Sequence, residues 1–240
     1  MSYETVNVEL EDYDFNTKQW TRYPSILHHS IVPFASGGLR YAFKAYNCNL
    51  QNWREYPMVL KISKYGQFQD EESGRNQVIM QSKCVKYANE FNSHPSVSKH
   101  VSFVSSQLVK FLYGKWAGMY ATMERYIGDN FIKHNTVNPE IDGVALTTRN
   151  TPQAFSHFTF EKSGKTEIVV DIQGVGDCYT DPQLYSVSLL YQEPYGPADW
   201  GIQGISNFFR NHRCNAVCRG LGLDPIRPTD YNSGTVPRYI

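Results

Sequence analysis

The hydrophobic and polar positions of this chain follow two different periods. In the first third, short runs of β-branched and aromatic residues alternate with turn signals, over residues 4–10, 25–34, 39–47 and 58–63, which is typical of strands. Residues 71–94 differ, because their apolar side chains recur at roughly helical spacing and the run ends before a His-Pro pair. The pattern therefore predicts a β-rich first third followed by one long helix.

The second half of the chain mixes both periods. Its expected elements are strands over 101–113 and 116–127, a helix over 151–164, a buried strand over 165–173 and a helix from residue 200 that ends at Gly220 or Gly222. A stretch rich in glycine, asparagine and proline begins near residue 128 and is loop-like. This order predicts an α+β fold with two lobes, divided near residue 128, and a cleft between them.

Composition and charge exclude several classes of protein. Lys+Arg and Asp+Glu are both 23, so no overall field favours nucleic acid or an anionic membrane as a partner. The polar, acidic first residues are not a signal peptide, and no run approaches the ~18 apolar residues that cross a bilayer. Five cysteines, an odd number, argue against a secreted disulfide scaffold. We therefore expect a cytoplasmic protein.

Gly37 and Gly38 lie between two strand-like runs, in PFASGGLRYAFKA. Taken alone, the pair favours a tight hairpin turn. The alternative is a loop that covers phosphate, because glycines let backbone N–H groups approach an anion and Arg40 adds positive charge. The Walker pattern, GxxxxGK followed by Ser or Thr, is absent from the sequence.

Lys61 interrupts an apolar run, YPMVLKISK, that otherwise predicts a buried strand. The commoner explanation is a lysine on an edge strand whose ammonium reaches water. The alternative is a lysine that points into a cleft and binds phosphates. The residues around Lys61 leave both explanations open.

The stretch VVDIQGVGDCYTDPQ places three acids and an amide on a glycine-containing turn after a buried strand. Its simplest interpretation is a solvated turn whose acids cap backbone amides. The alternative is a metal site, because Mg²⁺ prefers oxygen ligands such as Asp171, Gln173 and Asp181. One carboxylate is then left to accept a proton from an attacking hydroxyl. With the lysine and glycine loop, this favours phosphoryl transfer over a retaining glycosidase.

His212, Cys214 and Cys218 form an H-x-C-x₃-C pattern. On a continuous helix the two cysteines share one face, and such close nitrogen and sulfur donors indicate zinc, with buried thiols as the alternative. A closed structural site needs a fourth ligand. His157, on an apolar segment, is the best candidate, although a histidine in that setting is more often a core residue.

Eight motifs, in their order along the chain, resemble the atypical alpha-kinase family. They are GGLRYAFKA, MVLK, ANEFN, MERYIGDNFIKHN, AFSHFTFE, VVDIQGVGDCYTDPQ, GPADWG and HRCNAVCRGLGL, and they extend from about Val6 to about Leu223. The resemblance implies a protein-kinase-like fold, with a β-rich N-lobe of about residues 1–127 and a C-lobe of about 128–240. It also implies a protein serine/threonine kinase that uses Mg²⁺ and ATP and holds a structural zinc.

The resemblance assigns a role to individual residues. Gly37, Gly38, Leu39 and Arg40 would cover the phosphates, Lys61 would hold the α- and β-phosphates, and Glu124 and Ile127 would lie near adenine. Asp171 would orient the substrate hydroxyl as the catalytic base, and Gln173 and Asp181 would hold Mg²⁺. The zinc ligands would be His157, His212, Cys214 and Cys218.

The segment GPADWG matches a family loop that is thought to face the protein substrate, with Gly196, Ala198 and Gly201 as its family-type positions. Asp199 departs from the family pattern, and we expect this acid to shift preference away from acidic peptides. The kinase region fills the chain, so we expect a partner to supply regulation or targeting. A pseudokinase and a zinc-stabilised interaction domain are the rival hypotheses, but Lys61, Asp171 and Asp181 are all present.

Overall fold

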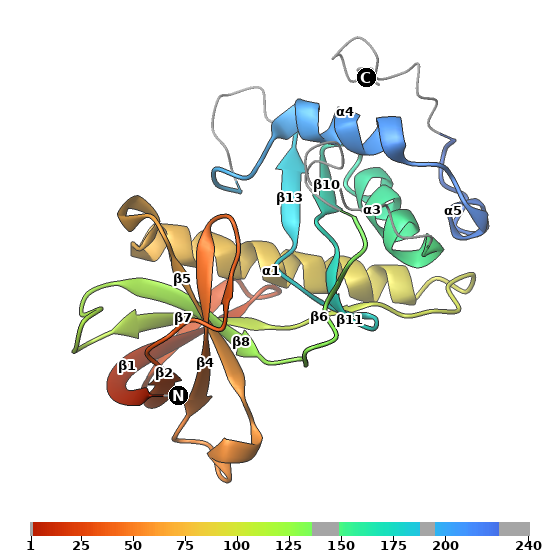
Figure 1. The fold of residues 1–240 in the computed structure, drawn as a ribbon. Coiled ribbons are helices and arrows are strands. Elements are labelled where there is room, and N and C mark those ends of the chain that lie inside the picture. Colours follow the sequence, from red (N-terminus) through yellow and green to blue (C-terminus); the bar gives the residue numbers. More distant parts are fainter. Residues whose placement is uncertain (1, 136–148, 188–194, 226–240) are drawn as a thin grey trace. The chain divides into compact units, whose positions relative to one another are not determined.

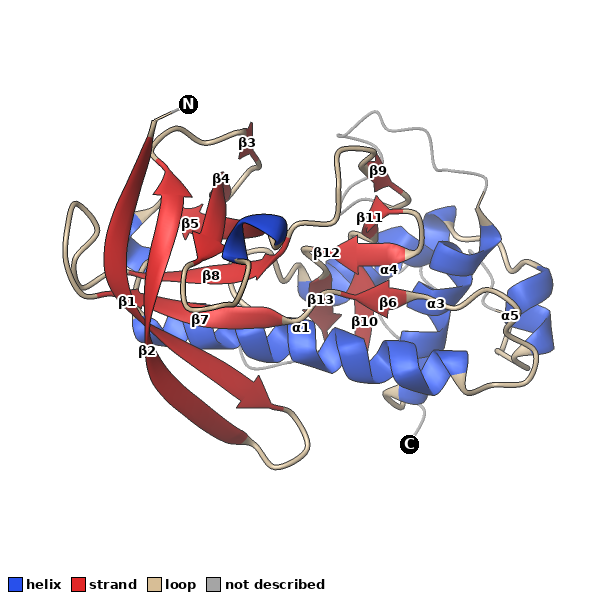
Figure 2. Cartoon of the chain, turned by 90° about the horizontal axis from the view of Figure 1, so that it is seen from below, coloured by secondary structure: helices blue, strands red, loops and turns tan. Residues whose placement is uncertain are grey.

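The computed structural model describes residues 2–135, 149–187 and 195–225, and the chain divides into two units (Figure 1). The first unit consists of Met1–Lys83 and Val104–Ile127, and the second of Cys84–Phe103 and Gly128–Ile240. The first unit is mostly strands, whereas the second combines helices with short strands (Figure 2). The mixture of α and β elements predicted from the sequence is confirmed.

The first unit contains seven strands and two short 3₁₀ turns. The strands are β1 (Tyr3–Asp14), β2 (Gln19–Ser30), β3 (Ala35–Ser36), β4 (Arg40–Asn47), β5 (Met58–Ser63), β7 (Ser106–Phe111) and β8 (Tyr120–Arg125), and the turns are η1 (Trp53–Glu55) and η2 (Gly66–Phe68). The strand order is β2-β1-β7-β8-β5-β4-β3, and every pairing is antiparallel. β2 also pairs with β4, so six strands close into a barrel.

All six strands of this closed ring send apolar side chains into its interior. The cluster includes Leu10 of β1, Leu27 of β2, Phe43 of β4, Leu60 of β5, Val109 of β7 and Met123 of β8. Successive side chains of a strand point to opposite faces. Leu60 and Ile62 belong to the core cluster, so Lys61 between them lies on the outer face of the barrel.

Helix α1 (Glu71–Asn92) confirms the helix predicted over residues 71–94. Asp70 caps its beginning by accepting a hydrogen bond of 2.7 Å from the backbone N–H three residues later. Gly74 permits close approach to the barrel, because a Cβ there would lie 2.4 Å from Cδ1 of Leu108. One turn later, Val78 packs against Leu108 in a small buried cluster. This face of the helix is therefore fitted to the outer face of the barrel.

The described residues of the second unit form three further helices and six short strands. They are α3 (Asn150–Lys162), α4 (Gly201–Asn211), α5 (Ala216–Gly220), β6 (Ser102–Phe103), β9 (Ile132–Lys133), β10 (Glu167–Val170), β11 (Gln173–Val175), β12 (Cys178–Thr180) and β13 (Gln183–Ser186). β10 and β13 pair with each other, and a second small sheet has the order β6-β12-β11-β9. Gly204 brings α4 onto β13, since a Cβ there would lie 2.4 Å from the ring of Tyr185.

The core of the second unit lies between helices α3 and α4 and the paired strands β10 and β13. Phe160 of α3, Ile168 of β10, Tyr185 of β13 and Phe209 of α4 are each at most 1% exposed and form one cluster. The C-terminal half of α1 joins the same unit, where the ring of Phe91 packs edge-on against Phe155 of α3. The short strands are thus supported by helices on which aromatic residues are concentrated.

Three sequence predictions of element bounds are wrong. The helix expected over 200–222 is two helices, because His212 leaves the helical conformation and Asn215 caps a new helix through the N–H groups of Val217 and Cys218. The strand expected over 101–113 is β6 and β7, which belong to different sheets. The strand expected over 165–173 ends at Val170, because the next residue has a positive φ.

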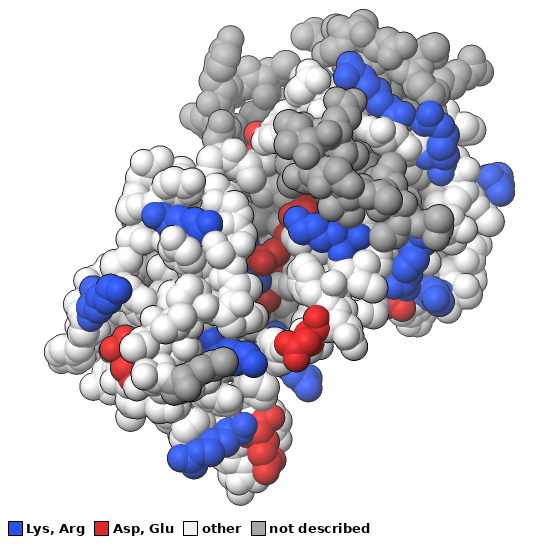
Figure 3. All heavy atoms as spheres, in the orientation of Figure 1, with Lys and Arg blue, Asp and Glu red and all other residues white. Residues whose placement is uncertain are grey.

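Two observations concern the expected partners. On the face shown in Figure 3, positive and negative side chains of the described residues are interspersed. None of the helices among the described residues is both long enough and apolar enough to span a bilayer.

Candidate functional site

The three residues predicted to hold metal and substrate come together on one hairpin of the second unit. β11 and β12 pair antiparallel, with Gln173 opposite Thr180 and Val175 opposite Cys178. Asp171 comes two residues before Gln173, and Asp181 directly follows Thr180. Both acids therefore lie at the open end of the hairpin, beside Gln173.

Both acids adopt an uncommon backbone conformation. Asp171 has a φ of 56° and Asp181 a φ of 51°, in the left-handed region that non-glycine residues seldom occupy. Such conformations cost roughly 1–3 kcal/mol each and are concentrated at functional sites, where the surrounding structure holds them in place. Gly174 completes the turn, since a Cβ there would lie 2.1 Å from the carbonyl oxygen of Cys178. A side chain at that position would force the hairpin apart.

Hydrogen bonds fix the side chains at this end of the hairpin. Nε2 of Gln173 donates to Oδ2 of Asp171 at 2.7 Å and to the backbone oxygen of Asp181 at 3.3 Å. The amide is thereby oriented with its nitrogen toward these acceptors. Lys133 of β9 places its ammonium 3.9 Å from Oδ1 of Asp171. The third acid of the stretch, Asp177, instead forms an ion pair with Arg149.

Two residues near the acids were not singled out from the sequence. Lys133 reaches Asp171 because β9 pairs with β11, with Lys133 opposite Gln173. Asn135 is 3% exposed, and its side-chain oxygen accepts a hydrogen bond of 2.8 Å from the N–H of Ile172. It therefore fixes the backbone between Asp171 and Gln173. Both residues lie in MERYIGDNFIKHN, one of the eight motifs of the family resemblance, and this was the sequence signal that could have identified them.

In the first unit, Gly37 and Gly38 lie in the loop between β3 and β4. The N–H of Gly37 donates to the carbonyl oxygen of Arg40 at 3.0 Å, so the segment is a tight hairpin. Lys64 supports the loop through its N–H, which donates to Leu39 at 2.9 Å, and through its ammonium, which donates to the carbonyl of Gly37. A Cβ at Gly38 would meet no atom within 4 Å, so the outer side of the loop is open. The hairpin interpretation is confirmed, and phosphate covering stays a prediction.

Lys61 is buried and paired, not exposed at an edge. Its side chain is 6% exposed, and its ammonium donates to Oε1 of Glu124 at 2.6 Å. β5 and β8 are neighbours, and Val59 lies opposite Glu124, so both side chains emerge from adjacent strands on the outer face. The carboxylate of Glu124 is therefore a partner of Lys61. Ile127 lies two residues beyond the end of β8 and is half-buried.

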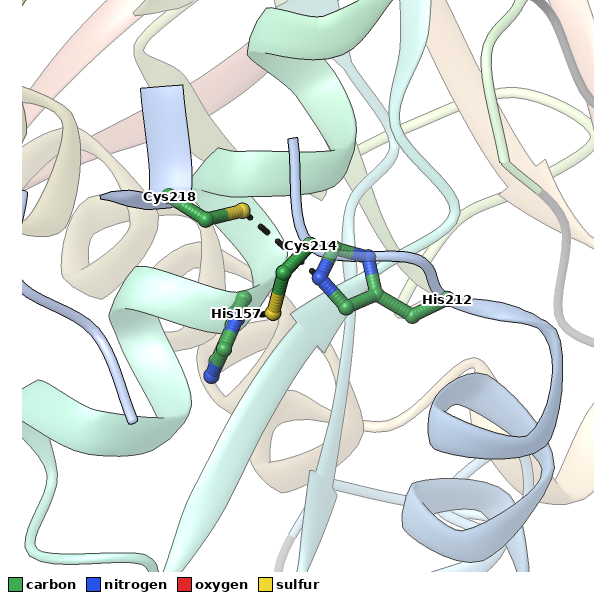
Figure 4. A group of neighbouring side chains, drawn as sticks. All are labelled: His157, His212, Cys214 and Cys218. Atoms are coloured by element: carbon green, nitrogen blue, oxygen red, sulfur yellow. Dashed lines mark hydrogen bonds between the residues drawn. The ribbon is translucent and has the colours of Figure 1, made fainter. Parts of the chain in front are cut away.

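The four predicted zinc ligands form one cluster in the second unit (Figure 4). His157 comes from α3 and Cys218 from α5, while His212 and Cys214 lie on the segment between α4 and α5. Their donor atoms all lie within 4.8 Å of one another. The sequence argument for Cys214 and Cys218 is wrong in one respect, because they do not share a face of one helix. The break after α4 is what turns both sulfurs toward the histidines.

The spacing and chemistry of this cluster fit zinc. Nδ1 of His157 is 3.7 Å from Sγ of Cys214, and Nε2 of His212 is 3.6 Å from Sγ of Cys218. Sulfur at about 2.3 Å and nitrogen at about 2.0–2.1 Å from a tetrahedral Zn²⁺ lie about 3.6 Å apart. Burial lowers the pKa of His157 to about 3 and that of His212 to about 4, so both imidazoles are neutral, as metal binding requires.

The thiols support the same conclusion. Burial raises the pKa of Cys218 to about 11, so without a cation its sulfur stays protonated and donates only weakly. Nε2 of His212 lies beside Sγ of Cys218 and is the nitrogen placed to bind a metal, while its Nδ1 is buried and has no hydrogen-bond partner among the described residues. Oε1 of Glu161 lies 4.0 Å from Nε2 of His157, where a carboxylate commonly orients a metal-bound histidine.

The segment of Gly196, Ala198 and Gly201 leads into α4. Gly196 and Gly201 have φ values of 79° and 54°, which favour glycine. Asp199 is 8% exposed and accepts hydrogen bonds from the N–H of Ser186 at 3.0 Å and that of Gly201 at 2.9 Å. The Ser186 hydroxyl also donates to it, at 2.8 Å. The carboxylate is therefore internal, and its expected effect on peptide preference stays a prediction.

Comparison with known proteins adds independent evidence. The family described as the alpha-kinase family matches residues 35–218. The chain is 35% identical to alpha-protein kinase 1 of Dictyostelium discoideum, over 94% of this chain and 16% of that protein. It is 31% identical to eukaryotic elongation factor 2 kinase of Homo sapiens, over 89% of this chain and 29% of that protein. The chain thus spans only a minor part of the length of these relatives.

Solved structures of kinase domains match the fold. The alpha-kinase domain of myosin-II heavy chain kinase A in complex with AMP-PNP is 30% identical, with a TM-score of 0.82 over 93% of this chain and 97% of that one. An inactive form of the same domain in complex with ATP has a TM-score of 0.80, over 93% of this chain and 99% of that one. The class defined by the fold and the site is that of protein kinase domains. Within this class, the chain belongs to the alpha-kinase family.

Proposed function

We propose that this chain is a protein serine/threonine kinase that transfers the γ-phosphate of Mg·ATP to a protein. The observation that carries the proposal is the β11–β12 hairpin, which holds Asp171 and Asp181 in left-handed conformations beside Gln173. Two carboxylates and an amide in this arrangement suit a hard cation. The matching kinase domains solved with ATP and AMP-PNP support the choice of nucleotide.

In the proposed reaction, each group of residues has one task. Asp171 accepts the proton of the substrate hydroxyl while the hydroxyl oxygen forms a bond to the γ-phosphorus. At the same time, the bond between the γ-phosphorus and the bridging oxygen breaks, and ADP leaves with that oxygen. Gln173 and Asp181 would hold Mg²⁺, which supplies neutralisation of phosphate charge. Lys61 binds the α- and β-phosphates, the hairpin of Gly37, Gly38, Leu39 and Arg40 covers them, and the backbone near Glu124 and Ile127 receives adenine. Positioning of the reactants and neutralisation of the phosphate charge therefore provide most of the rate enhancement.

The second proposed metal is a structural zinc held by His157, His212, Cys214 and Cys218. Four nitrogen and sulfur donors with no open position suit a structural rather than a catalytic site. The support is the spacing of the donors and the burial of both imidazoles, which lowers their pKa values. The proposed contribution of this site is to the stability of the second unit.

The remaining proposals concern the surroundings of the enzyme. We propose a protein substrate that contacts Gly196, Ala198 and Gly201, and a separate partner for regulation or targeting. We also propose a reducing compartment, the cytoplasm, which suits a chain whose five cysteines form no disulfide among the described residues.

The experiment compares acid-to-amide variants in a phosphate-transfer assay. Asp171→Asn and Asp181→Asn suit this test because asparagine also tolerates a left-handed backbone, so the hairpin survives while the charge is lost. We expect Asp171→Asn to lower the transfer of labelled γ-phosphate by about 10²–10⁴-fold, the usual contribution of a general base. Asp181→Asn should also weaken the dependence of turnover on Mg²⁺ concentration.

Asp177→Asn is the matched control, because Asp177 lies in the same stretch but pairs with Arg149. It should keep most of the wild-type activity. Wild-type protein that is folded and binds nucleotide but transfers no phosphate would contradict the proposed activity. Full activity in Asp171→Asn would instead remove only the role assigned to that residue.

A further inference from the structure

We propose that Gln81 of helix α1 is a positioning residue for the nucleotide-binding lysine, acting through Glu124. The inference rests on the proposed function, since it takes Lys61 to be a ligand of ATP. All three side chains belong to the first unit, and each is at most 6% exposed. Gln81 contributes no charge and did not stand out in the sequence.

The amide of Gln81 is held by two hydrogen bonds. Its Nε2 donates to the backbone oxygen of Val104 at 2.7 Å and to Oε2 of Glu124 at 3.0 Å. A side-chain amide nitrogen has two protons, so both are used. The bond to the backbone fixes the amide, and the second bond fixes one oxygen of the carboxylate.

The other oxygen of the same carboxylate holds the lysine. Oε1 of Glu124 accepts from Nζ of Lys61 at 2.6 Å, while Oε2 accepts from Gln81. The carboxylate cannot turn toward one donor without leaving the other. The position of the ammonium is therefore set partly by a neutral side chain on a helix.

The same helix is fixed to the barrel two turns earlier. Arg75 forms an ion pair of 2.6 Å with Glu11 of β1, which is fully buried and also pairs with Arg22 of β2 at 2.7 Å. Gly74 and Val78 pack against Leu108. Positions 74, 78 and 81 follow helical spacing, so Gln81 lies on the face that the barrel fixes.

This arrangement differs from the usual one in protein kinases, where a glutamate on a helix forms the ion pair with the lysine. Here the acid comes from β8, next to the strand of the lysine, and the helix supplies only an amide. The ion pair therefore survives the loss of the helix contact. Loss of Gln81 should weaken nucleotide binding in a graded way and leave phosphate transfer itself intact.

The test measures the dissociation constant of Mg·AMP-PNP by calorimetry and KM and kcat for ATP. We expect Gln81→Met to weaken AMP-PNP binding and raise KM for ATP by about tenfold, the effect of one hydrogen bond to a charged group, with kcat little changed. Gln107→Met is the matched control, because Gln107 of β7 also donates to two acceptors, Asp12 at 2.7 Å and Tyr23 at 2.8 Å. It should leave nucleotide affinity unchanged.

A double-mutant cycle identifies the route of the effect. In a Glu124→Gln background, Gln81→Met should have no further influence on nucleotide affinity, because the two residues act as one unit. An undiminished Gln81 effect in that background, or equal effects of Gln81→Met and Gln107→Met, would overturn the inference. Gln81→Asn, one methylene shorter, replaces Gln81→Met if the latter does not fold. Wild type that binds AMP-PNP but transfers no phosphate would contradict the proposed function, and the binding data would still decide the role of Gln81.

Discussion

The buried polar groups of the two units are satisfied in opposite ways. In the first unit, the carboxylate of Glu124 accepts hydrogen bonds from both the ammonium of Lys61 and the amide of Gln81. In the second unit, His157, His212, Cys214 and Cys218 turn two neutral imidazoles and two weakly donating thiols toward a common point. One cluster supplies both its donors and its acceptors, whereas the other supplies mostly acceptors for a cation.

The difference indicates how each cluster contributes to folding. A buried polar group costs free energy unless it is hydrogen-bonded or paired. The lysine cluster meets this condition with protein atoms alone, so it is complete before any ligand binds. With the proposed zinc, the histidine and cysteine cluster would meet it through a metal, and part of the stability of the second unit would be metal-binding free energy. The two clusters should therefore respond differently to the loss of one member.

The largest effect is expected from removing metal in the second unit. Cys214→Ala, or a strong chelator, should abolish zinc binding and unfold this unit, since structural zinc contributes about 10–16 kcal/mol in small zinc domains. Metal analysis together with circular dichroism measures both consequences. Cys48→Ala, a partly buried free thiol of the first unit, is the control and should keep metal and fold. Wild-type protein that is folded but contains no zinc would contradict the dependence of the second unit on a metal.

A smaller effect is expected from breaking the lysine cluster. Lys61→Met leaves Glu124 as a buried carboxylate without its cation and should lower the free energy of unfolding by about 3–5 kcal/mol. The double variant Lys61→Met, Glu124→Gln removes both charges and should regain part of that loss, although neither protein should transfer phosphate. Urea unfolding compares the three proteins. A double variant no more stable than the single one would contradict the idea of a self-sufficient pair.

The smallest effect is expected at Asp199, a buried acid that accepts hydrogen bonds from the uncharged residues Ser186 and Gly201. Asp199→Ala removes three hydrogen bonds from Ser186 and Gly201 and should cost about 1.5–3 kcal/mol, the net effect of hydrogen bonds to a charged group. Thermal unfolding measures this loss. Ser186→Ala is the paired variant, since it removes only the hydroxyl donor and should cost less. A stable Asp199→Ala protein with altered peptide preference would contradict this structural role and support the expected effect of the acid on substrate choice.

Much of the fold could be predicted because its signals are local. β5 follows the predicted bounds of Met58–Ser63, and α1 ends within two residues of its prediction, since both depend on periodicity and nearby turn signals. The acids could be predicted as a group for the same reason, because Asp171, Gln173 and Asp181 lie within one hairpin. The left-handed backbone conformations of the two acids were not predicted from the sequence and are seen only in the structure.

Other features depend on residues that are far apart in the sequence. Lys61 and Glu124 are separated by 63 positions, so the pair follows from strand order and not from any local pattern. The helix break that brings the two histidines and two cysteines together coincides with Asn215, which caps a new helix and lay inside an otherwise continuous helical pattern. The burial of Asp199 was not predicted, because burial of a polar residue depends on its partners, here Ser186.

The pairing of β2 with β4 has a consequence for how copies of this protein meet. An open sheet presents unpaired N–H and C=O groups at its edges, which other chains can extend into aggregates. In the first unit the ring of six strands is closed, but β2 pairs with β4 only over Leu27–His29, so Gln19–Ser25 of β2 has no strand partner on that side among the described residues. This part of β2 is therefore an edge at which another strand can add. Closure of the ring shortens the open edge of the sheet without removing it.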